Sequence, residues 1–171
     1  MKRLIYLIPV LFLLSCSKGM VTFTVKDSVE TTIENIFPIS IPFNIPIPAI
    51  TTTATQEFEN NKTTPELVQD VVVKDLQISL LDSNDDFSMI KSLHIFIKKV
   101  DDSDRIEVAY LDNIDSNSNV ISLDFLETNL VEYLREESYK IDVEVTLKEI
   151  VAHNIAIKID MEFKVTADLI R

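Results

Sequence analysis

The sequence is poor in glycine, cysteine and tryptophan. Gly19 is the single glycine, Cys16 is the single cysteine, and tryptophan is absent. Without glycine-rich loops the backbone cannot approach a phosphate closely, which excludes the P-loop and the dinucleotide-binding fingerprint. One cysteine excludes internal disulfides, cysteine-ligated zinc and iron–sulfur clusters. The turns must be made by Asn and Asp, which tolerate left-handed backbone conformations better than most residues do.

Positive charge is also scarce. The chain has 16 Lys and Arg residues against 28 Asp and Glu residues, a formal net charge of −12. Proteins that bind nucleic acid neutralise phosphates with clustered Lys and Arg side chains, and anionic lipid headgroups attract similar clusters. The sequence has no such cluster, so we expect neither a nucleic-acid partner nor a polybasic membrane contact.

One long apolar run is present near the N-terminus. Lys2 and Arg3 precede an apolar segment over residues 4–14, and small residues ending at Cys16 follow it. This order is typical of a secretory signal peptide, with its charged region, apolar core and cleavage point. The segment is too short for a transmembrane helix, which needs about 20 apolar residues. We therefore expect residues 1–15 to be a signal peptide that is removed.

The end of that run, Leu13-Leu14-Ser15-Cys16, resembles a bacterial lipobox. The resemblance implies that Cys16 becomes the first residue of the mature chain and carries a diacylglyceryl group and an N-linked fatty acyl chain. Anchoring by more than one acyl chain is stable where a single chain is not. Residues 16–19 would then be the lipidated Cys and a short tether, and the lipid would make the membrane a partner.

The residues after Cys16 bear on location. In such lipoproteins an Asp after the Cys signals inner-membrane retention, and Ser17 stands there instead, which implies the outer membrane. Surface-exported members carry acidic residues here, and segment 17–20 has none. The periplasmic face is therefore expected, with the cell surface as the alternative. The composition and the run over residues 87–97 are also similar to β-rich lipoproteins of Bacteroidetes-type bacteria, a resemblance that supplies no functional residues.

Apolar and polar side chains alternate along most of the remaining chain, as in strands with one buried face. The predicted strands cover residues 21–33, 71–81, 93–98, 106–110, 121–125, 141–147 and 155–166. Polar turns separate them, with hairpins expected at Asp101–Asp104 and at His153-Asn154. The sequence thus predicts an all-β fold, an antiparallel β-sandwich of about eight strands in a single domain over residues 20–171.

The segment 36–50 places its prolines with unusual regularity. Large apolar residues occupy the odd positions from Ile39 to Ile47, and all four prolines occupy even positions. Backbone N–H groups of an extended chain alternate as side chains do, so the prolines remove donors from one side only. This predicts an edge strand with its apolar positions toward the core. A polyproline-like arm is the alternative.

Three further segments complete the expected fold. The Thr-rich segment 51–58 is predicted as a strand, and residues 87–91 as one helical turn. Apolar residues between Leu126 and Leu134 have helical spacing, which predicts the one short helix, with Thr128 as its N-cap.

An acidic loop places oxygen-bearing side chains at alternate positions, Asp82, Asn84 and Asp86, as a calcium loop begins. The motif then departs from the pattern, because Phe87 stands where Gly is needed and Leu93 where a bidentate Glu is needed. Acidic turns in a glycine-poor chain are the simpler interpretation. These three residues are therefore weak metal candidates, and no cofactor is expected.

His94 is expected on a strand face and His153 in a turn, and neither lies in a catalytic motif. An aromatic platform for sugars is an alternative to core packing for Phe96, Tyr110, Tyr133 and Tyr139. No catalytic residue is predicted. We therefore expect a non-enzymatic, lipid-anchored envelope protein that binds or assembles with an envelope protein or a glycan. The alternative is a calcium-dependent or carbohydrate-active accessory protein, or a hydrolase, that uses the acidic loops.

Overall fold

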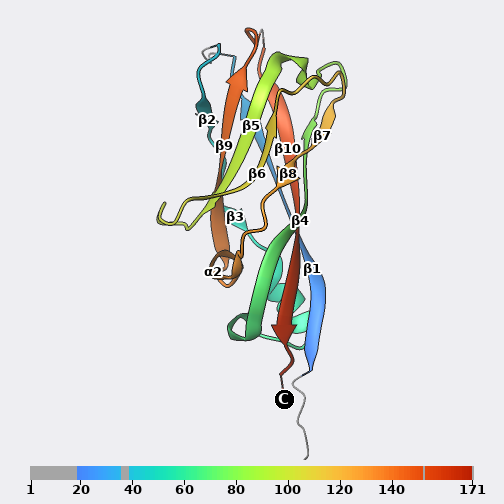
Figure 1. Cartoon of the computed structure of the whole chain (residues 1–171), viewed down its shortest axis with the longest axis vertical. Helices are drawn as coiled ribbons and strands as arrows, with labels where there is room; N and C mark the ends of the chain where they lie inside the picture. The colour runs from blue at the N-terminus through green and yellow to red at the C-terminus, as the bar shows by residue number, and fades with distance from the viewer. Residues whose placement is uncertain (1–18, 36–38, 152, 171) are drawn as a thin grey trace, which may run out of the picture.

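The alternation of apolar and polar side chains produces a sandwich of two β-sheets (Figure 1). This computed structural model describes residues 19–35, 39–151 and 153–170, and within these ranges it contains ten strands. The paired strands of both sheets are antiparallel. The predicted all-β sandwich is confirmed.

The first sheet has the strand order β1-β10-β4-β7. Its members are β1 (Met20–Ile33), β4 (Val68–Leu80), β7 (Val120–Ser122) and β10 (Ile155–Asp168). β1 and β10 pair along their whole length, from Met20 opposite Asp168 to Ile33 opposite Ile155. The start of β1 and the end of β10 therefore lie side by side at one end of the molecule (Figure 1).

The second sheet has the order β2-β9-β5-β6-β8, and β3 also pairs with β9. Its members are β2 (Phe43–Ile45), β3 (Ile50–Thr51), β5 (Ile90–Lys98), β6 (Ile106–Asp112), β8 (Asp124–Phe125) and β9 (Ser138–Leu147). β5 and β6 form the predicted hairpin. β9 and β10 belong to different sheets, so the hairpin predicted at His153-Asn154 is wrong. Two strands that each bury one face satisfy the same alternation whether they pair or face each other across a core.

The proline-rich segment contributes an edge strand, as predicted, but a very short one. β2 is the outermost strand of its sheet and pairs over three residues, between Pro42 and Pro46. Ile45 is buried, whereas Ile41 is 58% exposed, so the predicted burial of every odd position is wrong. The ladder is limited to the three residues between Pro42 and Pro46, and beyond it Ile47 is partly buried against the core whereas Ile41 is exposed.

The strand predicted over residues 51–58 is wrong, because helix α1 (Ala54–Asn60) occupies most of that segment. Ala54 and Phe58 stand four residues apart and are the buried residues of this helix. The Phe58 ring packs edge-on against Phe23 of β1, with 6.1 Å between ring centroids. In Figure 1 the end of the first sheet that carries the start of β1 extends past the second sheet, with α1 beside it.

The helix predicted near residue 130 is shorter than expected. α2 covers only Val131–Leu134, and Asn129 rather than Thr128 accepts a hydrogen bond from its first turn, from Val131 N at 3.0 Å. The segment predicted as a strand over 121–125 divides into β7 and β8, and so passes from one sheet to the other. The predicted helical turn after the acidic loop is confirmed as the 3₁₀ helix Phe87–Met89, and a second 3₁₀ turn covers Pro65–Leu67.

Asn and Asp do make the tight turns, as the scarcity of glycine predicts. Asp102, Asp104 and Asn113 have positive φ angles of 68°, 53° and 53°. Ser40 and Lys62 also have positive φ, at 61° and 55°, which the sequence did not indicate. Asn and Asp tolerate positive φ angles because their short polar side chains can form hydrogen bonds to the nearby backbone. The long side chain of Lys62 is not of this kind.

Candidate functional site

Cys16, the predicted lipid attachment site, lies outside the described residues. The first residue that the structure describes is Gly19, whose carbonyl oxygen accepts a hydrogen bond from Leu169 N at 3.0 Å. A Cβ atom at Gly19 would lie 3.0 Å from Leu169 Cδ1, so glycine permits this close approach. The chain therefore enters the fold in contact with the residue that follows β10.

The acidic loop is closed by its own hydrogen bonds. Asp82 Oδ1 accepts from the backbone N and the side-chain Nδ2 of Asn84, at 2.9 and 2.8 Å. Asp86 Oδ1 accepts from Ser88 N at 2.8 Å. These bonds hold the pKa of both carboxyl groups below its usual value. Within residues 19–35, 39–151 and 153–170, no three His, Cys, Asp or Glu side chains are grouped to hold a metal ion. Calcium binding by Asp82, Asn84 and Asp86 stays a prediction.

A histidine from a distant part of the chain contacts the acidic loop. His153 Nε2 lies 2.9 Å from Asp85 Oδ1, so the segment between β9 and β10 contacts the acidic loop. The His153 side chain is 61% exposed and that of Asp85 is 11% exposed. The other Asp85 oxygen, Oδ2, is buried and has no hydrogen-bond partner among the described residues. The pair has the carboxylate and imidazole of an acid–base couple, with the imidazole exposed and the carboxylate largely buried.

His94 lies on the outer face of the second sheet, as predicted, but it is not isolated there. Its Nδ1 is 2.6 Å from Glu107 Oε1 and its Nε2 is 3.4 Å from Asp112 Oδ1. Its ring stacks on Tyr110, with 6.2 Å between centroids. Partial burial lowers the pKa of His94, but the hydrogen bond and charge of Glu107, helped by Asp112, outweigh it, so the pKa is raised. This environment favours the protonated form of the imidazole more than water does.

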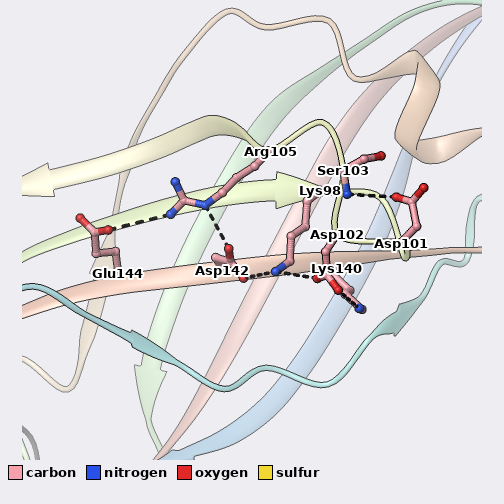
Figure 2. Close-up of polar contacts among 8 residues, drawn as sticks. All are labelled: Lys98, Asp101, Asp102, Ser103, Arg105, Lys140, Asp142 and Glu144. Atoms are coloured by element: carbon pink, nitrogen blue, oxygen red, sulfur yellow. Dashed lines mark hydrogen bonds and ion pairs between the residues drawn. The ribbon is translucent and has the colours of Figure 1, made fainter.

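A larger charged network covers the same face near the turn between β5 and β6 (Figure 2). Lys98 Nζ lies 2.7 Å from Asp142 Oδ1 and 2.9 Å from Asp102 Oδ1. Asp102 also receives Lys140 Nζ at 2.9 Å. Arg105 Nε donates to Asp142 Oδ2 at 3.0 Å. Strands β5 and β9 and the turn between β5 and β6 are thus joined by alternating charges.

The network is electrostatically satisfied. Hydrogen bonds to Asp142 and Asp102 raise the pKa of Lys98, and bonds from Lys98 and Lys140 lower the pKa of Asp102. The Arg105 guanidinium carbon lies 3.3 Å from the centre of the Phe96 ring, which adds a cation–π contact. A hollow of about 300 Å³ separates this network from β2. Its charges are already paired, so we assign it to holding the strands in register.

A buried polar site that joins the two sheets was missed by the sequence analysis. Asp27 of β1 is 5% exposed. Its Oδ1 accepts from Thr53 N at 2.8 Å and from Thr53 Oγ1 at 3.1 Å, and its Oδ2 accepts from Tyr139 Oη at 3.0 Å. Burial, and then the charge of Asp27, raise the pKa of Tyr139 well above its usual value. An acidic residue at an odd, apolar-parity position between Val25 and Val29 was the available signal.

The four candidate aromatic residues do not form one platform. Tyr139 and Tyr133 are core residues, 0% and 5% exposed. Tyr110 stacks on His94, and Phe96 lies beneath Arg105. Ordinary packing therefore accounts for them.

In the part of the chain that the structure describes, no helix has the length and apolar character to cross a bilayer. No protein-family model matches the chain. No curated protein matches it either. Among solved structures, it is similar to a chain of the cryo-EM structure of mud crab tombus-like virus. That likeness has 7% sequence identity and a TM-score of 0.32, and it covers 100% of this chain and 93% of the viral one. At this level the likeness identifies no relative.

Proposed function

We propose that this protein is a lipid-anchored component of a bacterial cell envelope, attached to the outer membrane through Cys16 and facing the periplasm. The sequence Leu13-Leu14-Ser15-Cys16, after two cations and an apolar run, is the observation that carries the proposal. The position of the fold supports it, because β1 starts at Met20, four residues after Cys16. A lipid there would hold the sandwich directly at the bilayer.

The role that we propose is binding or assembly rather than catalysis. The charged side chains on the outer face of the second sheet support a role other than catalysis, because they form ion pairs with one another. His94 is itself paired with two carboxylates, those of Glu107 and Asp112, and its pKa is raised by them. The partner in this proposal is another envelope protein or a glycan.

Lipidation is tested by replacing the acceptor. Cys16→Ala is expected to abolish incorporation of an alkyne fatty-acid probe and to move the protein from the membrane to the soluble fraction. Ser17→Ala is the matched control and should leave labelling and fractionation unchanged. A Cys16→Ala protein that remains in the membrane fraction with undiminished labelling would contradict the proposal. Crosslinking and pull-down from intact envelopes would then identify the partner.

One observation favours a second candidate, a calcium-dependent or carbohydrate-active accessory protein or hydrolase. Asp85 Oδ2 is buried in the acidic loop without a hydrogen-bond partner among the described residues. A cation would satisfy it, because carboxylate oxygens are the preferred ligands of calcium. Calorimetric titration should detect calcium binding, and Asp85→Asn should weaken it. Calcium should also raise the melting temperature of the unmodified protein. A melting temperature unmoved by millimolar calcium or by EDTA would remove this candidate.

A further inference from the structure

Three exposed apolar side chains lie at the end of the molecule where the chain enters the fold. Met20 begins β1, and Leu169 and Ile170 follow β10. Their exposed fractions are 61%, 39% and 54%. Met20 stands opposite Asp168 in the sheet, so the three residues lie at the same end of the molecule. We call this set the entry-end patch.

The backbone at this end is hydrogen-bonded rather than free. Leu169 N donates to Gly19 O at 3.0 Å, and Ile170 N donates to Lys62 O at 2.9 Å. Unpaired backbone groups resist transfer into lipid, so these bonds lower the free energy of bringing this end against a bilayer. The apolar side chains gain free energy on leaving water. The entry-end patch therefore has the chemistry of a shallow lipid contact.

The position of Cys16 decides what the patch faces. Three peptide units separate Cys16 from Gly19, and each spans about 3.8 Å between Cα atoms, so the two Cα atoms lie at most about 11 Å apart. The Cα atom of a lipidated Cys16 must therefore lie within that distance of Gly19, which contacts Leu169 of the patch. The end of the sandwich that holds Met20, Leu169 and Ile170 then has no long tether separating it from the headgroups.

We propose that the entry-end patch inserts into the interfacial region of the bilayer, so that the lipid on Cys16 and the apolar side chains of Met20, Leu169 and Ile170 form one composite anchor. The inference rests on the lipidation of Cys16 proposed above. It adds an orientation: β1 and β10, which run along the long axis of the molecule in Figure 1, stand steeply on the membrane.

The opposite end of the molecule provides an internal comparison. Ile150, in the connection between β9 and β10, is 70% exposed, and Ile41 is 58% exposed. β1 has 14 residues at about 3.3 Å each, so this end stands about 45 Å from Met20. Exposed apolar residues thus occur at both ends, and the position of Cys16 selects one of them for the membrane.

The experiment measures depth in the bilayer. Cys16 is the single cysteine of the chain, so a second cysteine introduced into the lipidated protein can be labelled alone. Ile170→Cys and Ile150→Cys would each carry an environment-sensitive fluorophore, in phosphatidylcholine vesicles with or without doxyl-labelled lipid. We expect doxyl lipid to reduce the Ile170→Cys emission about twofold or more, as for a side chain in the interface. Iodide in the water should quench the Ile150→Cys label instead.

The outcomes separate this inference from the proposed function. The mass of the N-terminal peptide reports whether Cys16 carries lipid. An unmodified Cys16 overturns the proposed function and this inference with it. A lipidated protein whose label at position 170 is quenched by iodide, and not by doxyl lipid, overturns this inference alone. If Ile170→Cys folds poorly, Met20→Cys gives the same test from β1.

Discussion

Tyr139 of β9 donates its hydroxyl proton to Asp27 of β1 across the sandwich, over 3.0 Å. This bond joins the two sheets at a point where both side chains are almost completely buried. The second Asp27 oxygen holds the backbone N–H of Thr53, just before α1. One carboxylate therefore fixes the distance between the sheets and the start of a helix.

Replacing Asp27 should be strongly destabilising. Asp27→Ala leaves the buried Tyr139 hydroxyl and the part-buried Thr53 N–H without their acceptor, and we expect a loss of about 3 kcal/mol in the free energy of unfolding. Tyr139→Phe removes one donor and leaves the Thr53 bonds in place, so it should lose about 1 kcal/mol. Urea unfolding followed by circular dichroism measures both. Asp160→Ala, on the outer face of β10, is the control and should change stability by under about 0.5 kcal/mol. Equal losses at Asp27 and Asp160 would contradict the assigned role.

The pKa of His94 should lie above its usual value because of Glu107. A raised pKa in the folded state means that protonated His94 stabilises the fold at pH values below the unfolded-state pKa. That stabilisation is lost as the pH rises through the folded-state pKa. Glu107→Gln removes the main favourable charge, so the pKa of His94 should fall. NMR titration of the imidazole protons measures it. A His94 pKa unaffected by Glu107→Gln would show that the contact is absent in solution.

Lys98 should contribute to stability in a way that depends on salt. Its side chain is 17% exposed and lies between Asp102 and Asp142. Lys98→Ala leaves both carboxylates without this partner, and we expect a loss of about 1 kcal/mol at low ionic strength that shrinks in high salt. Lys158→Ala removes a more exposed pair with Asp160 and should have little effect. Chemical unfolding in low and in high salt tests this, and a salt-independent loss would indicate a packing effect of the Lys98 side chain.

Position 62 should tolerate substitution by glycine better than substitution by a β-branched residue. Its φ of 55° is left-handed, and its carbonyl oxygen accepts from Ile170 N. A β-branched side chain is strained in this conformation, so Lys62→Val should lower the melting temperature, with a loss of about 1 kcal/mol or more. Lys62→Gly relieves the strain and should be neutral or stabilising. The reverse order of the two variants would show that the loop changes its conformation in solution.

Period-two alternation was enough to predict β4, β5, β6, β9 and β10, because each buries one face of a pleated strand. It failed for residues 51–58, where the spacing of Ala54 and Phe58 was the helical signal and tertiary burial of Phe58 decided the outcome. Alternation also does not say which strands are neighbours. Nothing local to β9 or β10 indicates that they lie in different sheets, or that Asp27 meets Tyr139. The candidate site at Cys16 was visible because processing signals are read from linear sequence.

The pairing of β1 with β10 has a consequence for how the protein folds. Thr22 and Thr166, 144 positions apart, stand opposite each other in the sheet. Long sequence separation between contacting residues slows folding, because the entropy of closing a large loop is lost before the contact forms. Strand β1 therefore cannot pair with β10 until the chain has been synthesised through β10. Until β10 has formed, both edges of the 14-residue strand β1 are open, and open edges are sites where another chain can pair.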